Sequence, residues 1–177
     1  NQQRALAKLS LIVPITIFFI FVLLYTAFNS IKFAALILAN VPFATIGGLL
    51  ALFLTGQYLS VPSAIGFIAV FGVAMLNGIV LVSFLNEQRE RGLSVREAVL
   101  QGTALRLRPV LMTASVAILG LVPMLISSGV GAETQRPLAT VVVGGLLSAT
   151  LLTLFLLPVL YEWLETRAER KNPEATP

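Results

Sequence analysis

Few polar side chains in the apolar part of this chain are able to do chemistry. Asn77 lies in the middle of an apolar stretch, among small residues, and Thr113 lies near the start of the next one. Asn40, Ser115 and Ser148 raise the same question more weakly. An amide surrounded by hydrocarbon must form a hydrogen bond, because an unpaired polar group there is strongly unfavourable. We therefore expect Asn77 either to bond a neighbouring helix, which is the more common role, or to line a hydrated path.

The side chains that an intramembrane enzyme requires are missing. The sequence has no His and no Cys, and its five long apolar stretches contain no Asp, Glu, Lys or Arg. Neither the base of a serine protease nor the ligands of a metalloprotease can be assembled from what remains. We predict no catalytic residue, no cofactor and no metal site. A gradient-driven transporter would need ionisable groups inside the membrane that these stretches do not supply.

The composition points to a membrane protein. Of the 177 residues, 57% are hydrophobic and 11% are charged, whereas soluble domains carry about 25% charged residues. A transmembrane helix needs about 20 apolar residues. We predict an all-α, polytopic membrane bundle over residues 9–160, with a periplasmic-side lead-in at 1–8 and a cytoplasmic tail at 161–177. Its five predicted spans are residues 9–28, 33–54, 63–85, 109–127 and 138–160.

The basic residues predict the orientation. With the N-terminus outside, nine of the twelve Lys and Arg residues fall in inner segments, and only Arg4, Lys8 and Arg136 fall outside. The positive-inside rule therefore favours an N-terminus outside the membrane and a C-terminus in the cytoplasm, and it explains the net charge of +4 without a nucleic-acid partner. Translocating Arg4 and Lys8 is easier if another span or domain precedes them, so we expect the chain to be a piece of a longer protein.

The longest polar segment predicts a short helix of its own. Ser94 and Glu97 match a capping box, in which each side chain satisfies a free backbone amide of the other residue. Apolar residues follow at helical spacing. We predict an amphipathic helix over residues 94–105 on the cytoplasmic membrane surface; the alternative is a solvated connector.

Small residues within the spans predict close helix packing. Glycines let the backbones of neighbouring helices approach each other. We expect this packing role for Gly72 and Gly78 in the third span, and for Gly144 and Gly145 in the fifth.

Two stretches carry a resemblance to a known family. The first is FGVAMLNGIVLV at 71–82, continuing to LRLRPVLMT at 105–113; the second is GAETQRPLATVVVGG at 131–145, continuing to LPVLY at 157–161. Both resemble the C-terminal half of an RND-superfamily efflux pump, most closely its heavy-metal-efflux branch. The resemblance covers essentially the whole chain, as the last five of the family's twelve membrane helices.

The resemblance implies a proton-driven antiporter of the bacterial inner membrane. Such a pump works as a homotrimer with a periplasmic adaptor and an outer-membrane channel, and its acidic relay lies in the remaining half of the permease. In the multidrug branch an Arg and a Thr of the eleventh helix belong to the relay, and their motif positions here are Arg106 and Thr113. A relay Lys of the tenth helix is replaced by Leu76, and the Asn next to it is retained as Asn77, which is the third candidate for proton relay or transport. For Arg106, the alternative is simple anchoring at the membrane edge.

The same resemblance narrows the transported substrate. Copper and silver pumps of the metal branch use pairs of methionines, whose soft thioethers suit soft ions. This chain has only three methionines, so cobalt, zinc, cadmium or nickel is favoured. The alternatives to a heavy-metal pump are a multidrug RND permease and a non-transporting membrane scaffold or truncated fragment.

Overall fold

The chain folds into a bundle of helices. The computed structural model describes residues 2–171, except for the side chains of 2–6 and 9, and contains no strand within that range. Five helical segments are long and apolar enough to cross a membrane, so the predicted all-α membrane bundle is confirmed. The helices are α1 (Gln2–Phe28), α2 (Ile31–Leu38), α3 (Asn40–Leu54), α4 (Val61–Glu90), α5 (Val95–Ile126) and α6 (Ala132–Lys171).

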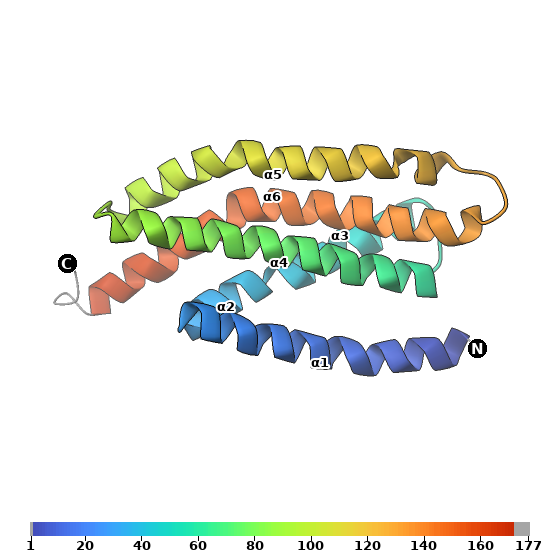
Figure 1. Ribbon diagram of the computed structural model, residues 1–177, viewed down its shortest axis with the longest axis horizontal. Coiled ribbons are helices and arrows are strands. Elements are labelled where there is room, and N and C mark those ends of the chain that lie inside the picture. Colours follow the sequence, from blue (N-terminus) through green and yellow to red (C-terminus); the bar gives the residue numbers. More distant parts are fainter. Residues whose placement is uncertain (1, 172–177) are drawn as a thin grey trace.

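Helix α6 is the centre of the bundle. It contacts α2, α3, α4 and α5, and Figure 1 shows it lying beside α4 and α5. It continues well past the predicted end of the fifth span at residue 160, into the segment predicted as the tail. Residues 172–177 of that tail lie outside the described part of the chain.

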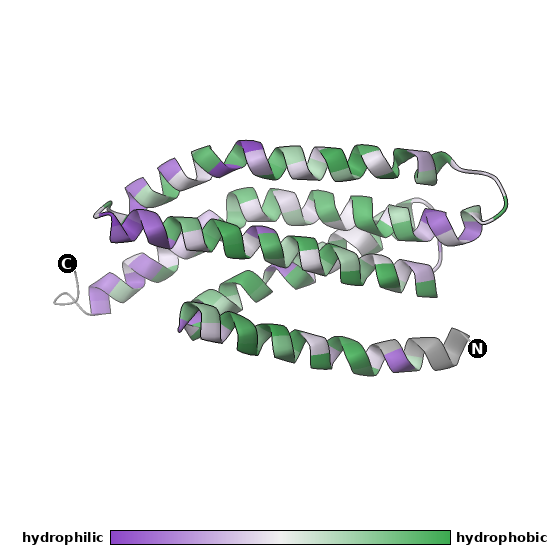
Figure 2. Cartoon of the chain, viewed as in Figure 1, coloured by the Kyte–Doolittle hydropathy of each residue, from purple (hydrophilic) through white to green (hydrophobic). Residues whose placement is uncertain are grey.

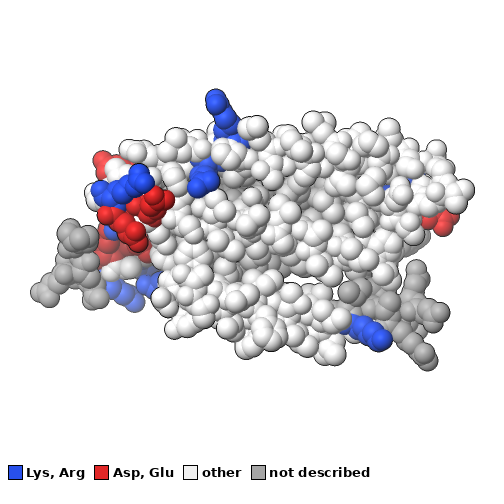
Figure 3. Space-filling model, in the orientation of Figure 1, with Lys and Arg blue, Asp and Glu red and all other residues white. Residues whose placement is uncertain are grey.

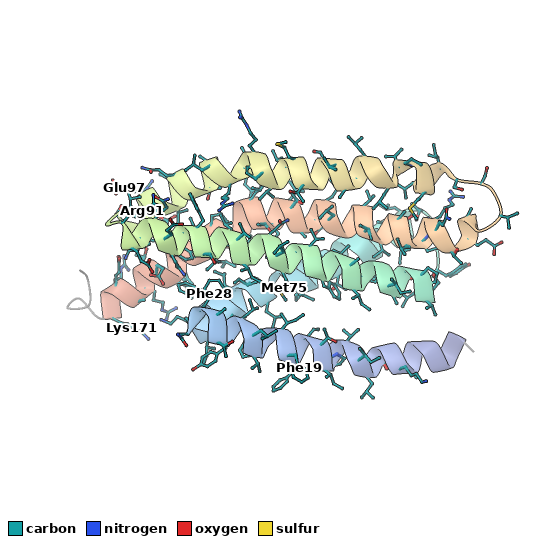
Figure 4. All side chains as sticks on the ribbon, in the orientation of Figure 1. Phe19, Phe28, Met75, Arg91, Glu97 and Lys171 are labelled. Atoms are coloured by element: carbon teal, nitrogen blue, oxygen red, sulfur yellow. The ribbon has the colours of Figure 1, made fainter. Side chains whose placement is uncertain are left out.

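Helix α1 stands at the edge of the bundle. It contacts only α2 and α4 among the described elements, and only 6% of the residues in its apolar stretch are buried. Figure 4 shows Phe19 pointing away from the other helices, whereas Phe28 lies at the turn into α2. There the ring of Phe28 meets the ring of Phe33 edge-on, with their centroids 6.3 Å apart. The C-terminal end of α1 is therefore the part that joins it to the bundle.

The second predicted span is broken into two helices. Helix α2 ends at Leu38 and α3 begins at Asn40, so the pair covers one 24-residue crossing. Pro42 has no backbone N–H to donate to the Leu38 carbonyl, which interrupts the helix at Ala39. Asn40 is buried at this break, and its Nδ2 donates to the Ala74 carbonyl oxygen at 3.5 Å.

The segment predicted as a separate surface helix is the first part of α5. The capping box is present, because Ser94 Oγ accepts from the Glu97 N–H at 3.3 Å and Glu97 Oε2 accepts from the Ser94 N–H at 3.1 Å. The pKa of the Glu97 carboxyl is held below its ordinary value, chiefly because the Ser94 hydroxyl donates to Glu97 Oε2 at 2.8 Å and also because the Ser94 N–H donates to the same oxygen. The helix then runs without interruption to Ile126, so the prediction of a separate helix ending at 105 was wrong.

Two physical reasons explain this difference. Pro109 removes only one backbone hydrogen bond, which inclines α5 without ending it, and Figure 1 shows this first part of α5 set at an angle to the rest. The apolar face that predicted contact with lipid is buried against α4 instead. A Cβ at Gly102 would lie 2.5 Å from a methyl group of Leu85.

Charged side chains gather at the ends of the bundle. Figure 2 shows an apolar middle and hydrophilic ends, and Figure 3 shows acidic and basic groups clustered where the α4–α5 turn meets the end of α6. Basic side chains also stand part-way along α5 (Figure 3). The uncharged surface between the ends has the composition that a bilayer core requires.

Side chains at the charged end hold α4, the α4–α5 turn and α6 together. Arg89 on α4 forms an ion pair with Glu169 on α6, with Nη2 and Oε1 2.5 Å apart. The Nη1 of Arg89 donates to the Leu93 carbonyl oxygen at 3.0 Å, within the α4–α5 turn. Tyr161, which is buried, donates its hydroxyl proton to Asn86 Oδ1 at 2.5 Å. These contacts fix the end of α6 against the turn.

Candidate functional site

A groove of about 220 Å³ between α4 and α5 contains the three residues proposed for proton coupling. Asn77 enters it from α4, and Arg106 and Thr113 enter it from α5. Helical spacing explains the grouping, because residues three or four apart share one face of a helix. The complete lining is Leu76, Asn77, Val80, Leu81, Arg106, Pro109, Val110 and Thr113.

Arg106 stands at one end of the groove over an aromatic ring. Its guanidinium carbon lies 4.7 Å from the centroid of the Phe84 ring, a cation–π contact worth about 0.5–1 kcal/mol at exposed sites. Within the described part of the chain, the ion pairs are Arg89 with Glu169 and Arg91 with Glu87. Arg106 is thus positioned by α4 while its charge has no carboxylate partner among the described residues.

Thr113 presents an accessible hydroxyl. Its Oγ1 donates to the Pro109 carbonyl oxygen at 2.9 Å, one helical turn earlier, and the side chain is exposed. This bond uses the proton of the hydroxyl, so the lone pairs of Oγ1 face outward as acceptors. The hydroxyl can therefore accept a hydrogen bond from a group that enters the groove.

Asn77 faces the groove and does not link two helices within the described part of the chain. Its side chain is half-buried, lines the groove and forms no hydrogen bond with another described residue. Asn40 is the amide that links two helices here, although its sequence signal was weaker. The amide of Asn77 is left available for a partner in the groove.

The neighbouring surface is apolar and open. Leu76 is 59% exposed and Met112 is 61% exposed, on either side of the groove. Phe84, which positions Arg106, carried no sequence signal that separates it from other apolar residues of its helix. The contact depends on where α5 crosses α4, and periodicity does not specify that crossing.

Three of the four glycines expected at helix contacts lie at close approaches. A Cβ at Gly144 would lie 2.3 Å from the Cβ of Ala51, and one at Gly145 would lie 2.8 Å from a methyl group of Val70. A Cβ at Gly78 would lie 2.8 Å from Nδ2 of Asn40. A larger side chain at any of these positions would require the neighbouring atoms to shift.

Gly72 is the fourth expected glycine, and Gly47 is a further glycine at a close contact. No described atom lies within 4 Å of a Cβ at Gly72, so the structure shows no close helix contact at this position. Gly72 lines an apolar groove of about 260 Å³ between α1 and α4. Gly47 on α3 faces Gly144 across the contact of α3 with α6, and its own Cβ would lie 2.3 Å from the Cβ of Ser148.

No metal-binding cluster is present within the part of the chain that the structure describes. No group of three or more His, Cys, Asp or Glu side chains there lies close enough together to hold an ion.

Comparison with known proteins identifies the family. The model of the AcrB/AcrD/AcrF family matches residues 1–165. The cobalt-zinc-cadmium resistance protein CzcA of Cupriavidus metallidurans is 53% identical over 98% of this chain, and the nickel and cobalt resistance protein CnrA of the same organism is 49% identical over 99% of it. The chain covers 16% of each of these relatives.

A solved structure agrees with the sequence relatives. A crystal structure of a heavy metal efflux pump matches 93% of this chain with a TM-score of 0.84 and 54% identity, and the match covers 17% of that pump's chain. The resemblance inferred from the motifs at 71–82, 105–113 and 131–145 is confirmed. The chain belongs to the AcrB/AcrD/AcrF family and corresponds to one part of its heavy-metal efflux pumps.

Proposed function

We propose that this chain is the C-terminal membrane segment of a proton-driven heavy-metal cation efflux permease. The observation that carries the proposal is the groove that brings together Asn77, Arg106 and Thr113 on an open face of the bundle. A helix from the remaining half of the permease, carrying the acidic relay residues, would occupy this face. The segment is incomplete for transport without that half.

The groove has the chemistry to control a carboxylate that enters it. A cation within a few Å lowers the pKa of a carboxyl group by about 1–3 units. Arg106 would therefore hold an incoming carboxylate ionised, with hydrogen bonds from Asn77 and other donors adding to the effect. Protonation of the carboxylate would remove its attraction to Arg106, and this change in charge is a means of coupling proton entry to helix movement.

The proposed setting follows from charge and from the relatives. We place the N-terminal end of α1 at the periplasm and the charged end of α6 in the cytoplasm of a bacterial inner membrane. The assembly would be a homotrimer that works with a periplasmic adaptor and an outer-membrane channel and is surrounded by membrane lipid. The relatives named for cobalt, zinc, cadmium and nickel favour a divalent cation of this group as cargo.

Two other functions remain as alternatives. A multidrug permease of the same superfamily is disfavoured by Leu76, which is exposed beside the groove at the position of the relay Lys. A non-transporting scaffold would not need the polar groups of the groove, and it predicts that their removal is harmless.

Metal tolerance of cells that lack other metal exporters tests the proposal. The chain is produced together with the remaining half of the permease, and growth is measured in zinc and cobalt. We expect Arg106→Gln and Thr113→Val to abolish most of the protection at equal protein level, and Asn77→Ala to weaken it. Arg108→Gln is the matched control, because Arg108 is exposed on the same helix and does not line the groove.

Two outcomes would contradict the proposal. Wild-type tolerance in all three groove variants would favour the scaffold. Protection by the 177-residue chain alone would show that the segment does not need a partner half. Arg106→Lys distinguishes a relay role of Arg106 from simple anchoring. A lysine anchors a helix at the membrane edge equally well but lacks the planar guanidinium.

A further inference from the structure

The outer face of α6 changes in character along its length. Side chains at every fourth position share one face of a helix. This row winds slowly around the helix, by about 40° for every fourth residue. From Phe155 to Arg167 its side chains are exposed and pass from apolar to aromatic to basic: Phe155, Val159, Trp163 and Arg167. The order matches the layers of half a bilayer, with hydrocarbon first, then the interface, then the phosphate groups.

A hollow of about 530 Å³ lies where the aromatic part of this face meets the basic part. The guanidinium carbon of Arg167 lies 5.1 Å from the centroid of the Trp163 ring, which orients the charge over the hollow. Arg170 and Thr166 line the same hollow, and Glu162 is its acidic member. Two guanidinium groups, one hydroxyl and one carboxylate of α6 therefore line one side of this open hollow.

The other acidic residues of this segment face away from the hollow. Glu169 is paired with Arg89 of α4 at 2.5 Å, and Glu165 lines a separate cavity together with Arg89 and Glu169. The inner face of the α6 extension thus holds two carboxylates next to the bundle. The outer face, with Arg167, Arg170 and Lys171 against Glu162, is left with net positive charge.

We propose that this hollow binds the headgroup of an anionic phospholipid. Arg167 and Arg170 donate hydrogen bonds to the phosphate, Trp163 packs against the glycerol backbone, and Val159 and Phe155 contact an acyl chain. An anionic lipid is favoured over a zwitterionic lipid, because the cation in a zwitterionic headgroup would be repelled by Arg167 and Arg170.

The axial spacing along α6 fits this arrangement. With a rise of 1.5 Å per residue, Arg167 lies roughly 6 Å beyond Trp163 and Phe155 lies roughly 12 Å before it. Each headgroup layer of a bilayer is about 5–8 Å thick. When Trp163 is at the edge of the hydrocarbon, Arg167 is at the depth of the phosphates. The inference does not depend on the transport function or on which leaflet is involved.

Trp163 is the only tryptophan of the chain and reports directly on this site. The 177-residue chain is reconstituted in phosphatidylcholine vesicles that contain, at the same mole fraction, either brominated phosphatidylglycerol or brominated phosphatidylcholine. Bromine quenches tryptophan fluorescence only at short range. We expect at least twofold stronger quenching by the brominated phosphatidylglycerol.

The variants separate a headgroup site from general attraction to the surface. We expect Arg167→Gln with Arg170→Gln to remove the preference, and Arg136→Gln, at the opposite end of the same helix, to leave it unchanged. Equal quenching by the two lipids in the wild-type chain would overturn the proposal without any variant. A preference that survives in the double variant, with unchanged helical circular dichroism, would also overturn it.

Discussion

The contact between α3 and α6 gives the sharpest test of the packing described above. At Gly144, an added Cβ would lie 2.3 Å from the Cβ of Ala51 and 2.7 Å from the carbonyl oxygen of Gly47. Carbon atoms in ordinary contact are about 3.5–4.0 Å apart. The obstacle includes backbone, which cannot rotate away, so Gly144→Ala must push the two helices apart by roughly 1 Å.

The size of the effect follows from this displacement. Overpacking a tight contact costs about 1–3 kcal/mol, and the backbone obstacle at Gly144 points to the upper part of that range. Separation of the helices also weakens the hydrogen bond from Ser148 Oγ to the Phe43 carbonyl oxygen, now 2.9 Å, which is worth about 0.6 kcal/mol inside a membrane. Part of this loss is offset, because alanine is a better helix former than glycine and adds about 0.5–1 kcal/mol to the free energy of unfolding.

Gly72→Ala is the matched control. It makes the same chemical change within α4, where no described atom lies within 4 Å of the new Cβ. Only the propensity gain of about 0.5–1 kcal/mol applies there. We therefore expect Gly144→Ala to lower the free energy of unfolding and Gly72→Ala to raise it slightly, with a difference of about 2–3 kcal/mol between the variants.

Thermal unfolding in lipid bicelles, followed by circular dichroism, measures this difference. For a chain of this size, 1 kcal/mol shifts the melting temperature by about 2–4 °C, so the two variants should differ by roughly 5–10 °C. Equal melting temperatures, or a Gly144→Ala variant more stable than the wild type, would refute the tight contact of α3 with α6.

Three further changes test other contacts in the same assay. Gly78→Ala places a methyl group against the Asn40 amide and should destabilise the chain; Asn40→Ala in the same molecule should recover most of the loss, and a simple sum of the two losses would contradict that contact. A double-mutant cycle of Arg89→Gln with Glu169→Gln should give a coupling of about 0.5–1 kcal/mol that falls in high salt, as expected for a partly exposed pair. Ser94→Ala should lower the melting temperature by removing the cap of α5, whereas Ser94→Asp, another good capping residue, should preserve it.

The parts of the fold that depend on local chemistry could be predicted from the sequence. Five spans follow from the length of the apolar stretches, and the start of α5 follows from the side chains of Ser94 and Glu97. The break between α2 and α3 was missed, although Pro42 was visible, because a proline in a membrane helix can bend it or divide it. Surrounding contacts, such as the burial of Asn40, decide between these outcomes.

The parts that depend on distant contacts could not be predicted. Residues 94–105 have the apolar pattern of a surface helix. The pattern shows that one face is apolar, but it does not show that Leu85 of α4, and not lipid, contacts this face at Gly102. The motif positions identified Arg106 and Thr113, and only the crossing of α4 and α5 shows that they share a groove with Asn77. Gly72 has the same local sequence features as a packing glycine, and its open surroundings depend on how far α1 stands from α4.

The continuity of α5 gives its kink a mechanical meaning. Because α5 runs unbroken past its bend at Pro109, a change of angle at this pivot, between Arg106 and Thr113, moves the end of the helix at Ile126. Ile126 lies roughly 25 Å from that pivot. A tilt of about 5° would therefore displace the far end by roughly 2 Å. In the proposed permease, a proton that binds beside Arg106 would act close to this pivot, and the end of α5 at Ile126 would move through the larger distance.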